Sequence, residues 1–185
     1  IYLSSSANNT FCHNGFINNR ASQVYIFYSS TNVWDDGYPS GGNYWSGYKG
    51  ADMLSGTYQN ETGGDGVGDT SYIIDSNNAD HYPLMGLFNS YNVTYFTPPL
   101  VSRACNVTVI SNSTISDFVA AIWIEHPEVI FLEFYVTGEQ SSTGFCRVSF
   151  PTAMMNGTYH VSVNGTEVPY DLLPCSNSTY SYLYF

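Results

Sequence analysis

Large apolar and polar side chains alternate most clearly in the second half of the chain. FLEFYV, residues 131–136, alternates large apolar residues with Glu133 and Tyr135, as strands with one buried face do. Comparable stretches are NVTVISNSTIS, AAIWI, EVIFLEFYVTG, TGFCRVSFP, GTYHVSVNGTEVPYDL and STYSYLYF. Asn164-Gly165 is a strong hairpin signal. We therefore expect about six or seven short strands in an immunoglobulin-like β-sandwich over residues 91–185.

Residues 1–90 combine short polar turns, asparagines and aromatic residues instead. NNTFCHNGFINN mixes a few apolar residues with asparagines, and QVYIFYSSTNVWDDG repeats the arrangement about a dozen residues later. Asparagine suits the corners of a parallel β-helix, because it tolerates left-handed backbone and its side chain can bond along the stack. We place the boundary between the two regions near FTPPL, where Pro98 and Pro99 stiffen the joint.

VAAIWIEHPEVIFL is the one stretch with a plausible helical apolar face. Pro127 divides it, and proline inside a helix removes a hydrogen bond and clashes with the preceding turn. We expect two strands around a turn at His126–Glu128. The fold class predicted for the whole chain is therefore all-β.

The formal charge of −11, from fifteen acidic and four basic residues, limits the choice of partners. Binding to nucleic acid or to an anionic membrane needs clustered Lys and Arg, so both are excluded as partners. Neither a signal peptide nor an apolar run of eighteen residues is present. Because the chain opens in mid-pattern at Ile1, we expect a processed or excised segment whose membrane anchor lies elsewhere.

Eight Asn-x-Ser/Thr triplets favour an exported glycoprotein of the cell surface. Their asparagines are Asn8, Asn60, Asn92, Asn106, Asn112, Asn156, Asn164 and Asn177. At each single site an unglycosylated polar turn is the alternative.

The four cysteines lie too far apart for a zinc-thiolate pattern. Cys105, Cys146 and Cys175 fall in the last half, so a single disulfide there leaves one of them over. Four cysteines allow three full pairings, and the sequence does not choose among them. Cys12 is either a buried apolar side chain or a thiol that reaches another chain.

Two further segments carry a family resemblance. NVWDDGYPSGGNYWSGYKG (32–50) and GGDGVGDTSYIIDSNNADHYPLMG (63–86) together resemble the end of a NosD-type right-handed parallel β-helix, a pectin-lyase-like family common in archaeal surface proteins. The resemblance covers residues 1–86, and the second half is similar to the β-sandwich that follows such helices. The NosD name is associated with copper delivery. A copper site is not carried over to this chain, because the sequence has no cluster of Cys, His or Met.

The resemblance implies that the aromatic segment caps the last coil. Trp34, Tyr38, Tyr44 and Trp45 would cover that coil, and Gly41 and Gly42 would permit the tight turn. The alternative is an aromatic platform on which sugar rings stack.

The Asp/Gly loop is the candidate calcium site. GDGVGD spaces Asp65 and Asp69 around glycines, Asp75 and Asp80 follow, and closely spaced carboxylates on a bent loop suit Ca²⁺. Gly63 stands where the family pattern has an acid, so Glu61 would have to substitute. An acidic turn without metal is the alternative.

Candidate catalytic groups are few. Asp35 and Asp36 are adjacent, so in an extended strand they point to opposite faces. The histidines at positions 13, 81, 126 and 160 are scattered, and His81 reads better as part of the cap than as a base. We expect no enzyme.

The pattern predicts two uncovered ends. The first coil, from Ile1, has none above it, and the family's sandwich continues past a strand like the one that ends at Phe185. An uncovered edge invites pairing, so we expect head-to-tail self-assembly into an extracellular filament, sheath or S-layer-like structure. A fragment of a monomeric surface protein is one alternative. A carbohydrate-binding or adhesion module that contacts cell-surface glycans through Trp34 and Trp45 is another.

Overall fold

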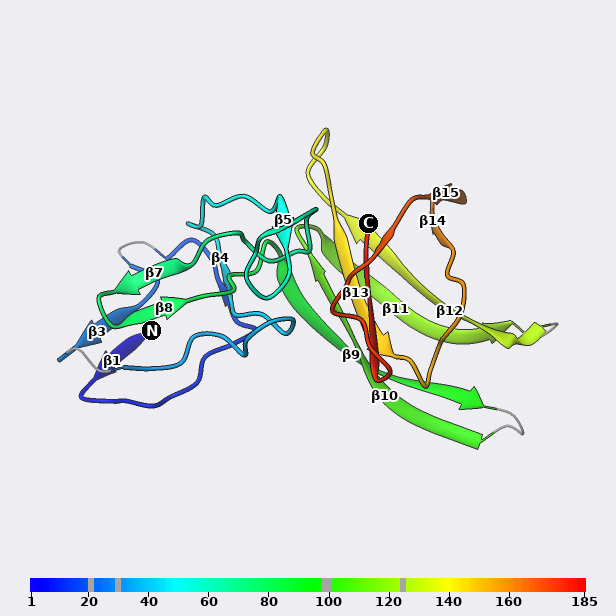
Figure 1. Ribbon diagram of the computed structural model, residues 1–185, viewed down its shortest axis with the longest axis horizontal. Coiled ribbons are helices and arrows are strands. Elements are labelled where there is room, and N and C mark those ends of the chain that lie inside the picture. The colour runs from blue at the N-terminus through cyan, green and yellow to red at the C-terminus, as the bar shows by residue number, and fades with distance from the viewer. Residues whose placement is uncertain (20–21, 29–30, 98–100, 124–125) are drawn as a thin grey trace. The chain divides into compact units, whose positions relative to one another are not determined.

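The computed structural model describes residues 1–19, 22–28, 31–97, 101–123 and 126–185. Strands, turns and loops account for all of these residues, and no helix occurs among them, so the all-β prediction is confirmed (Figure 1). The chain divides into two compact units, Ile1–Phe88 and Asn89–Phe185. The sequence had placed this boundary after residue 90.

The N-terminal unit is built from short strands. They are β1 (Tyr2–Ser4), β2 (Gly15–Phe16), β3 (Tyr25–Phe27), β4 (Tyr44–Trp45), β5 (Leu54–Ser55), β6 (Glu61–Thr62), β7 (Tyr72–Asp75) and β8 (Asn78–Asp80). β1 pairs in parallel with β3, and β2 pairs in parallel with β4. β5–β6 and β7–β8 are antiparallel hairpins.

The parallel pairs arrange the described residues between 1 and 47 as two stacked layers. Tyr2 lies opposite Tyr25, Thr10 bridges to Val33, and Gly15 lies opposite Tyr44. The corners of the first layer include Asn8, His13 and Asn18, whose positive φ angles lie in the left-handed region that asparagine tolerates. The expected repeat of about a dozen residues was wrong, because bonded residues of the two layers are 23 or 29 positions apart.

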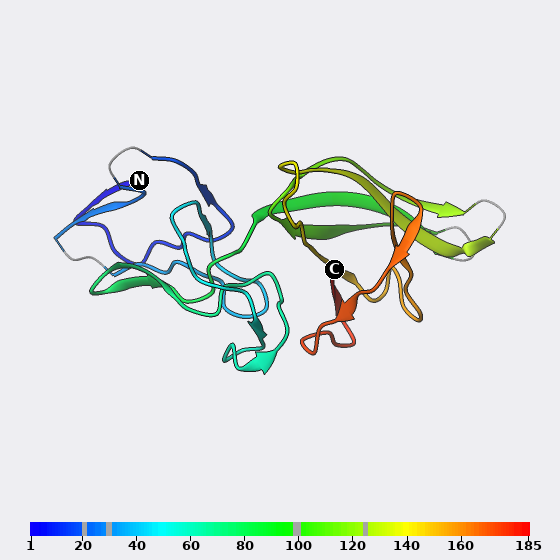
Figure 2. The same cartoon turned by 90° about the horizontal axis from the view of Figure 1, so that it is seen from above.

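The strands of the C-terminal unit are longer. They are β9 (Leu87–Thr97), β10 (Val101–Ser111), β11 (Thr114–Trp123), β12 (His126–Thr137), β13 (Cys146–Pro151), β14 (Val161–Val163), β15 (Thr166–Val168), β16 (Asp171–Leu172) and β17 (Tyr180–Tyr184). One sheet has the order β16-β17-β13-β10-β9, and β11–β12 and β14–β15 are hairpins outside it. Figure 2 shows the β11–β12 hairpin lying along this sheet.

The core of this unit lies between the five-stranded sheet and the β11–β12 hairpin. Val107 and Phe150 of the sheet are fully buried, and Phe118 and Phe134 of the hairpin pack against the same cluster. Phe118 stacks on Tyr91 of β9, with 4.1 Å between ring centroids. Alternation along each strand thus places one face inward, as the pattern of FLEFYV predicts.

The Asn164-Gly165 hairpin is confirmed. Both residues have positive φ, +51° and +75°, and they join β14 to β15. Such a pair of left-handed residues matches the right-handed twist of the flanking strands.

Two local predictions were wrong. Trp123 pairs with His126, so β12 begins inside the expected turn at His126–Glu128, and residues 124–125 lie outside the described ones. Pro98 and Pro99, the predicted joint, lie outside the described residues, and the structure divides the two units after Phe88. β17 lies between β13 and β16, so it is not the uncovered edge.

Candidate functional site

The two tryptophans of the aromatic segment are buried at the centre of the N-terminal unit. Trp34 and Trp45 are each 1% exposed. Trp34 stacks on Phe11 at 4.6 Å, and Trp45 lies between Phe16 at 4.1 Å and Tyr72 at 4.3 Å. Their ring faces are covered by other rings of the same unit, which suits a cap and leaves no face for a sugar. Tyr38 and Tyr44 are half-buried beside them.

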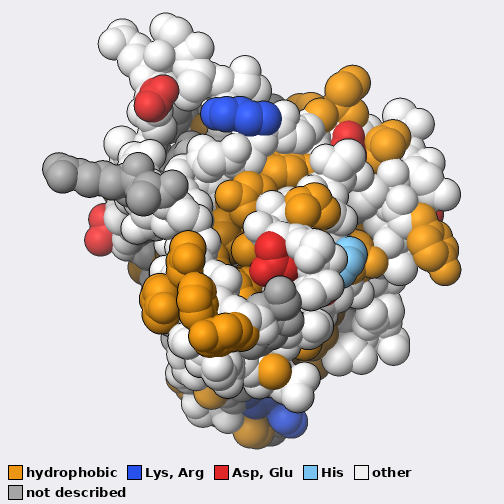
Figure 3. Space-filling view, turned by 90° about the vertical axis from the view of Figure 1, so that its left-hand side faces the viewer, with side chains coloured by type: hydrophobic (Ala, Val, Ile, Leu, Met, Phe, Trp, Pro, Cys, Tyr) orange, Lys and Arg blue, Asp and Glu red, His pale blue; other side chains and the backbone are white. Residues whose placement is uncertain are grey.

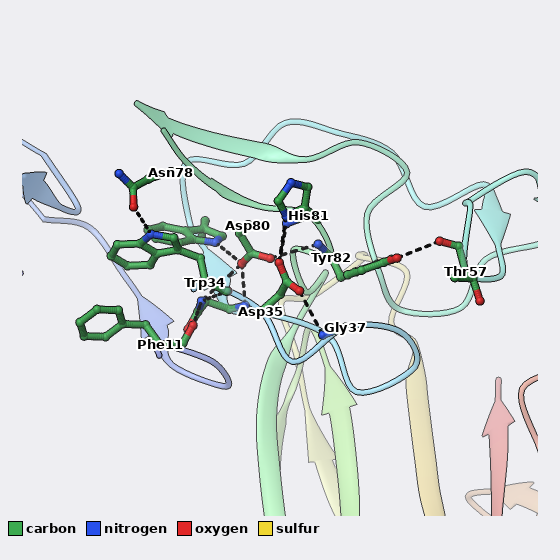
Figure 4. Close-up of polar contacts among 11 residues, drawn as sticks. Phe11, Trp34, Asp35, Gly37, Thr57, Asn78, Asp80, His81 and Tyr82 are labelled. Atoms are coloured by element: carbon green, nitrogen blue, oxygen red, sulfur yellow. Dashed lines mark hydrogen bonds and ion pairs between the residues drawn. The ribbon is translucent and has the colours of Figure 1, made fainter. Parts of the chain in front are cut away.

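Two ladders of polar side chains run from the first layer through the second and end at Asn78 and Asp80 of β8. In the first, Asn9 donates through its backbone N and its Nδ2 to Asn32 Oδ1, at 3.1 and 2.8 Å. Asn32 N donates in turn to Asn78 Oδ1, 2.9 Å away. The Nε1 of Trp34 donates to the same Asn78 oxygen at 3.0 Å (Figure 4). In this ladder the side-chain oxygen of Asn32 accepts bonds from the first layer, and the side-chain oxygen of Asn78 accepts bonds from the second.

The second ladder has the same polarity and ends on a carboxylate. Asn14 donates through its backbone N and its Nδ2 to Asn43 Oδ1, at 3.1 and 3.0 Å. Asn43 N donates to Asp80 Oδ2 at 2.7 Å, and Trp45 Nε1 donates to the same oxygen at 2.8 Å. Tyr82 N donates to the other oxygen at 3.1 Å. Asp80 thus ends the ladder as an acceptor.

Asp80 is completely buried. Burial raises its pKa from 3.8 to about 6, against the hydrogen bonds from Trp45, Asn43 and Tyr82, which lower it. Because no surface of this carboxylate is exposed, it can hold Asn43, Trp45 and Tyr82 together but cannot reach a dissolved substrate.

This burial predicts a pH effect on stability. The folded state holds the Asp80 proton up to a pH of about 6, whereas the unfolded state releases it near 3.8. The contribution of Asp80 to the free energy of unfolding should therefore fall by up to about 3 kcal/mol between pH 4 and pH 6. Denaturant unfolding of the wild type and of Asp80→Asn at four pH values between 4 and 7 measures it. The free energy of unfolding is plotted against pH for each protein. The difference between the two slopes gives the contribution of Asp80, because the other acids are present in both proteins. Parallel curves would contradict the expectation.

Gly41 and Gly42 make the close turn that the sequence predicts, each for its own reason. Gly41 has a φ of +90°, in the left-handed region where side chains are strained. Gly42 has room for no side chain, because an added Cβ would lie 1.9 Å from Asp80 Oδ1. The turn thus lets the backbone approach the buried carboxylate.

The other carboxylates predicted for calcium are distributed over separate backbone segments. Asp65, fully buried, accepts from Val67 N and from Gln59 Nε2, at 3.0 and 3.2 Å. Asp69 accepts from the backbone N of Met53 and of Leu54.

The remaining two predicted ligands also lie apart. Asp75 accepts from Asn77 N at 2.8 Å, and Glu61 is exposed on β6. Among the residues that the structure describes, no three of His, Cys, Asp and Glu gather into a metal-binding group. Calcium at this loop stays a prediction.

Asp52, which lies before β5, also bonds to this loop, although the sequence analysis did not single it out. It accepts from the backbone N of Asp65 and of Gly66, at 2.8 and 2.9 Å. Burial raises its pKa to about 6. No second carboxylate lies near Asp52 in the segment KGADM, so the sequence around it gives no sign of a ligand site. The predicted turn around Asp65 was the one signal that could have suggested Asp52.

His81 sits at the edge of the cap. Its Nδ1 lies 3.1 Å from Asp35 Oδ2, and its backbone N donates to the same oxygen (Figure 4). The exposed His160 contacts Glu167 in the other unit, and His13 stacks on Phe88. The structure therefore spreads the histidines over separate places, as the sequence predicts.

The four cysteines, all among the described residues, form no disulfide bond with one another in the structure. A disulfide, within the chain or from Cys12 to another chain, stays a prediction. Cys105 Sγ contacts Met154 Sδ, and Cys146 Sγ contacts Ser111 Oγ, each at 3.6 Å. Burial raises the pKa of Cys12, Cys105 and Cys146, which disfavours the reactive thiolate. Cys12 is half-buried. This exposure does not decide between a buried apolar side chain and a thiol that reaches another chain.

All eight asparagines of the predicted glycosylation sites are exposed. They are Asn8, Asn60, Asn92, Asn106, Asn112, Asn156, Asn164 and Asn177. Exposure is what a glycan requires at each of them.

Comparisons with protein-family models, with curated proteins and with solved structures found no match. The resemblance to the NosD-type β-helix therefore stays a prediction. Among the described residues, no helix is long and apolar enough to cross a membrane.

Proposed function

We propose that the chain is a non-catalytic structural protein of the cell exterior, a subunit of a filament, sheath or S-layer-like assembly joined by β-edge contacts. The observation that carries the proposal is the edge strand β9. Within the described residues β9 pairs only with β10, is 11 residues long, and contains neither a charged residue nor a proline. Soluble proteins commonly protect such edges with charge, proline or shortness.

The two edges of the five-stranded sheet differ in this respect. β16, at the opposite edge, has only two residues, which is itself a form of protection. Along β9, Val93 and Tyr95 are buried, while Ser90 and Phe96 are exposed. A strand from another subunit could therefore pair with β9 without disturbing the core, by β-augmentation.

An exterior location is supported by surface chemistry. The eight exposed sequon asparagines suit a glycosylated surface, and the charge of −11 disfavours nucleic acid and anionic lipid as partners. The buried acids support a structural role, since Asp65 and Asp80 are both occupied by hydrogen bonds within their own unit.

The proposal takes the N-terminal unit as the last coils and cap of a parallel β-helix. Parallel pairing of β1 with β3 and of β2 with β4 supports this, as do the two side-chain ladders. It takes the C-terminal unit as an immunoglobulin-like sandwich, supported by the hairpin packed on the five-stranded sheet. The carbohydrate-binding alternative is disfavoured, because Trp34 and Trp45 are buried.

Lysines on the exposed face of β9 test the proposal. Ser90→Lys with Phe96→Lys places two positive charges on the edge strand and keeps the Asn92 sequon intact. We expect filaments of the wild type by electron microscopy, and at least about a tenfold weaker association of the variant by sedimentation velocity, since like charges meet across a paired edge. Leu172→Lys, at the exposed β16 edge, is the matched control and should assemble like the wild type.

Two outcomes would overturn this function. One is a wild-type chain that stays monomeric and folded at high concentration. The other is a double-lysine variant that assembles as well as the wild type.

A further inference from the structure

The open edge of β9 belongs to the C-terminal unit along most of its length. β9 runs over Leu87–Thr97, and its first two residues lie in the N-terminal unit, which leaves the nine residues Asn89–Thr97. None of the nine is charged or a proline. Ser90 and Phe96 are exposed on the outer face of the sheet, opposite the core. Which strand of a second copy can pair with this edge depends on the other edges that the chain presents.

The other strand edges of the C-terminal unit do not match β9. β16, at the far side of the same sheet, has two residues, and β14 and β15 have three each. In the β11–β12 hairpin, β11 contains Asp117, whose φ of +50° accompanies a register shift between Ser116 and Val119. β12 contains Pro127 and Glu133. Shortness, charge, proline and irregular pairing all keep an edge from accepting a further strand.

The N-terminal unit has no matching edge among its described residues either. Figure 3 shows hydrophobic side chains on the surface of this unit, but its longest strand, β7, has only four residues. It therefore offers no strand that pairs along nine residues. By elimination, the long uncharged edge that the described part of a second copy presents to β9 is β9 itself.

The sequence of β9 suits pairing with itself. Two copies of one strand pair in antiparallel orientation about a two-fold axis, and residues of the same face lie opposite each other. An axis at Val93, the middle of the nine residues, pairs them from end to end. On the core side, Tyr91 then lies opposite Tyr95 of the second copy. On the outer side, Ser90 lies opposite Phe96 of the second copy. Aromatic cross-strand pairs stabilise a sheet, and no charged residue opposes another along this contact.

The glycosylation site on β9 leaves this edge open. Asn92 Nδ2, the atom that would carry a glycan, donates to Asn106 Oδ1 at 3.4 Å. Asn106 lies on β10, so the bond directs this nitrogen over the sheet and away from the open side of β9. A glycan at Asn92 would therefore begin on the outer face of the sheet and is compatible with pairing at its edge.

We propose that β9 pairs with β9 of a second copy, antiparallel about a two-fold axis at Val93, and that this closed dimer is the building unit of the assembly. The inference rests on the proposed function, because it names the partner of the same edge. A two-fold contact uses the same surface of both subunits, so it stops at two chains and differs from the head-to-tail contact expected from the sequence. A filament of this protein then requires a second, different contact between dimers.

Two variants with charges at the same two positions test the pairing. Ser90→Lys with Phe96→Lys, the double-lysine variant, sets lysine opposite lysine twice in the dimer. Ser90→Lys with Phe96→Glu, the mixed-charge variant, differs only at position 96 and sets lysine opposite glutamate twice. By sedimentation velocity, we expect the mixed-charge variant to dimerise at least about tenfold more tightly than the double-lysine variant, since two repulsive pairs become attractive. Both variants keep the Asn92 sequon, and hydrogen exchange in the central strand β13 reports whether each is folded.

A mixture gives an independent measurement. Ser90→Glu with Phe96→Glu should fail to dimerise alone, as the double-lysine variant does, because glutamate then opposes glutamate. An equimolar mixture of these two proteins should form a dimer with one chain of each. In the wild type, the amides of Asn89–Thr97 should exchange more slowly as the protein concentration rises.

The outcomes separate this inference from the function on which it rests. A wild type that stays monomeric at high concentration overturns both. Equally weakened association in the mixed-charge and double-lysine variants, or a mixture that forms no mixed dimer, overturns the two-fold pairing while assembly through β9 stands. A wild type that grows one chain at a time, with no dimer as its smallest unit, also overturns the two-fold pairing alone.

Discussion

Gly42→Ala is expected to destabilise the N-terminal unit by about 3–5 kcal/mol. The new Cβ would lie 1.9 Å from Asp80 Oδ1 and 2.4 Å from its Cγ, and this carboxylate is fully buried. Either the backbone or Asp80 must move, and movement of Asp80 breaks its bonds to Asn43 N and Trp45 Nε1. Hydrogen exchange measured by mass spectrometry should show the loss in residues 1–88 and not in residues 89–185.

Gly47→Ala is the matched control. An added Cβ at Gly47 meets nothing within 4 Å, and its φ is not in the left-handed region. Its effect should stay within about 1 kcal/mol and could be stabilising, because alanine restricts the unfolded chain. Equal losses in the two variants would show that the approach of Gly42 to Asp80 does not hold the cap.

Trp45→Ala should cost the same unit about 3–5 kcal/mol. The indole fills the space between Phe16 and Tyr72, so its removal leaves a cavity where two stacked contacts were. It also removes the Nε1 donor to Asp80. Denaturant unfolding at fixed pH measures the free energy of unfolding.

Trp45→Phe separates the two contributions. Phenylalanine keeps a ring between Phe16 and Tyr72 but has no donor, so the loss should be smaller, about 1–3 kcal/mol. The pKa of Asp80 should rise further, because the bond from Trp45 lowers it. A Trp45→Phe loss as large as that of Trp45→Ala, with no change in the pH profile, would assign the role of Trp45 to something other than stacking.

Features that depend on a residue and its near neighbours in the chain were predictable from the sequence. Alternation identified the strands around FLEFYV, and Asn164-Gly165 identified a hairpin. Trp34 and Trp45, two of the rare aromatics of residues 32–50, are buried, and their role as a cap stays a prediction. In each case the residue itself carries the preference, whether for one buried face, for left-handed backbone or for a large buried ring.

Long-range pairing was not predictable in the same way. Alternation does not say which strand lies beside which, so the uncovered edge was expected beyond β17, whereas β9 forms it. Bonded residues of the two layers are 23 positions apart in one ladder and 29 in the other. Because the two distances along the chain differ, the sequence shows no repeat of constant length. A single acid such as Asp80 looks the same in a sequence whether it binds calcium or ends an asparagine ladder, so the ladder was not predictable from it.

The second ladder passes through a single residue on its way to the buried carboxylate. Asn43 accepts from Asn14 and donates to Asp80. A change at Asp80 would therefore reach the first layer through one side chain, so that the layers would loosen together and not one at a time.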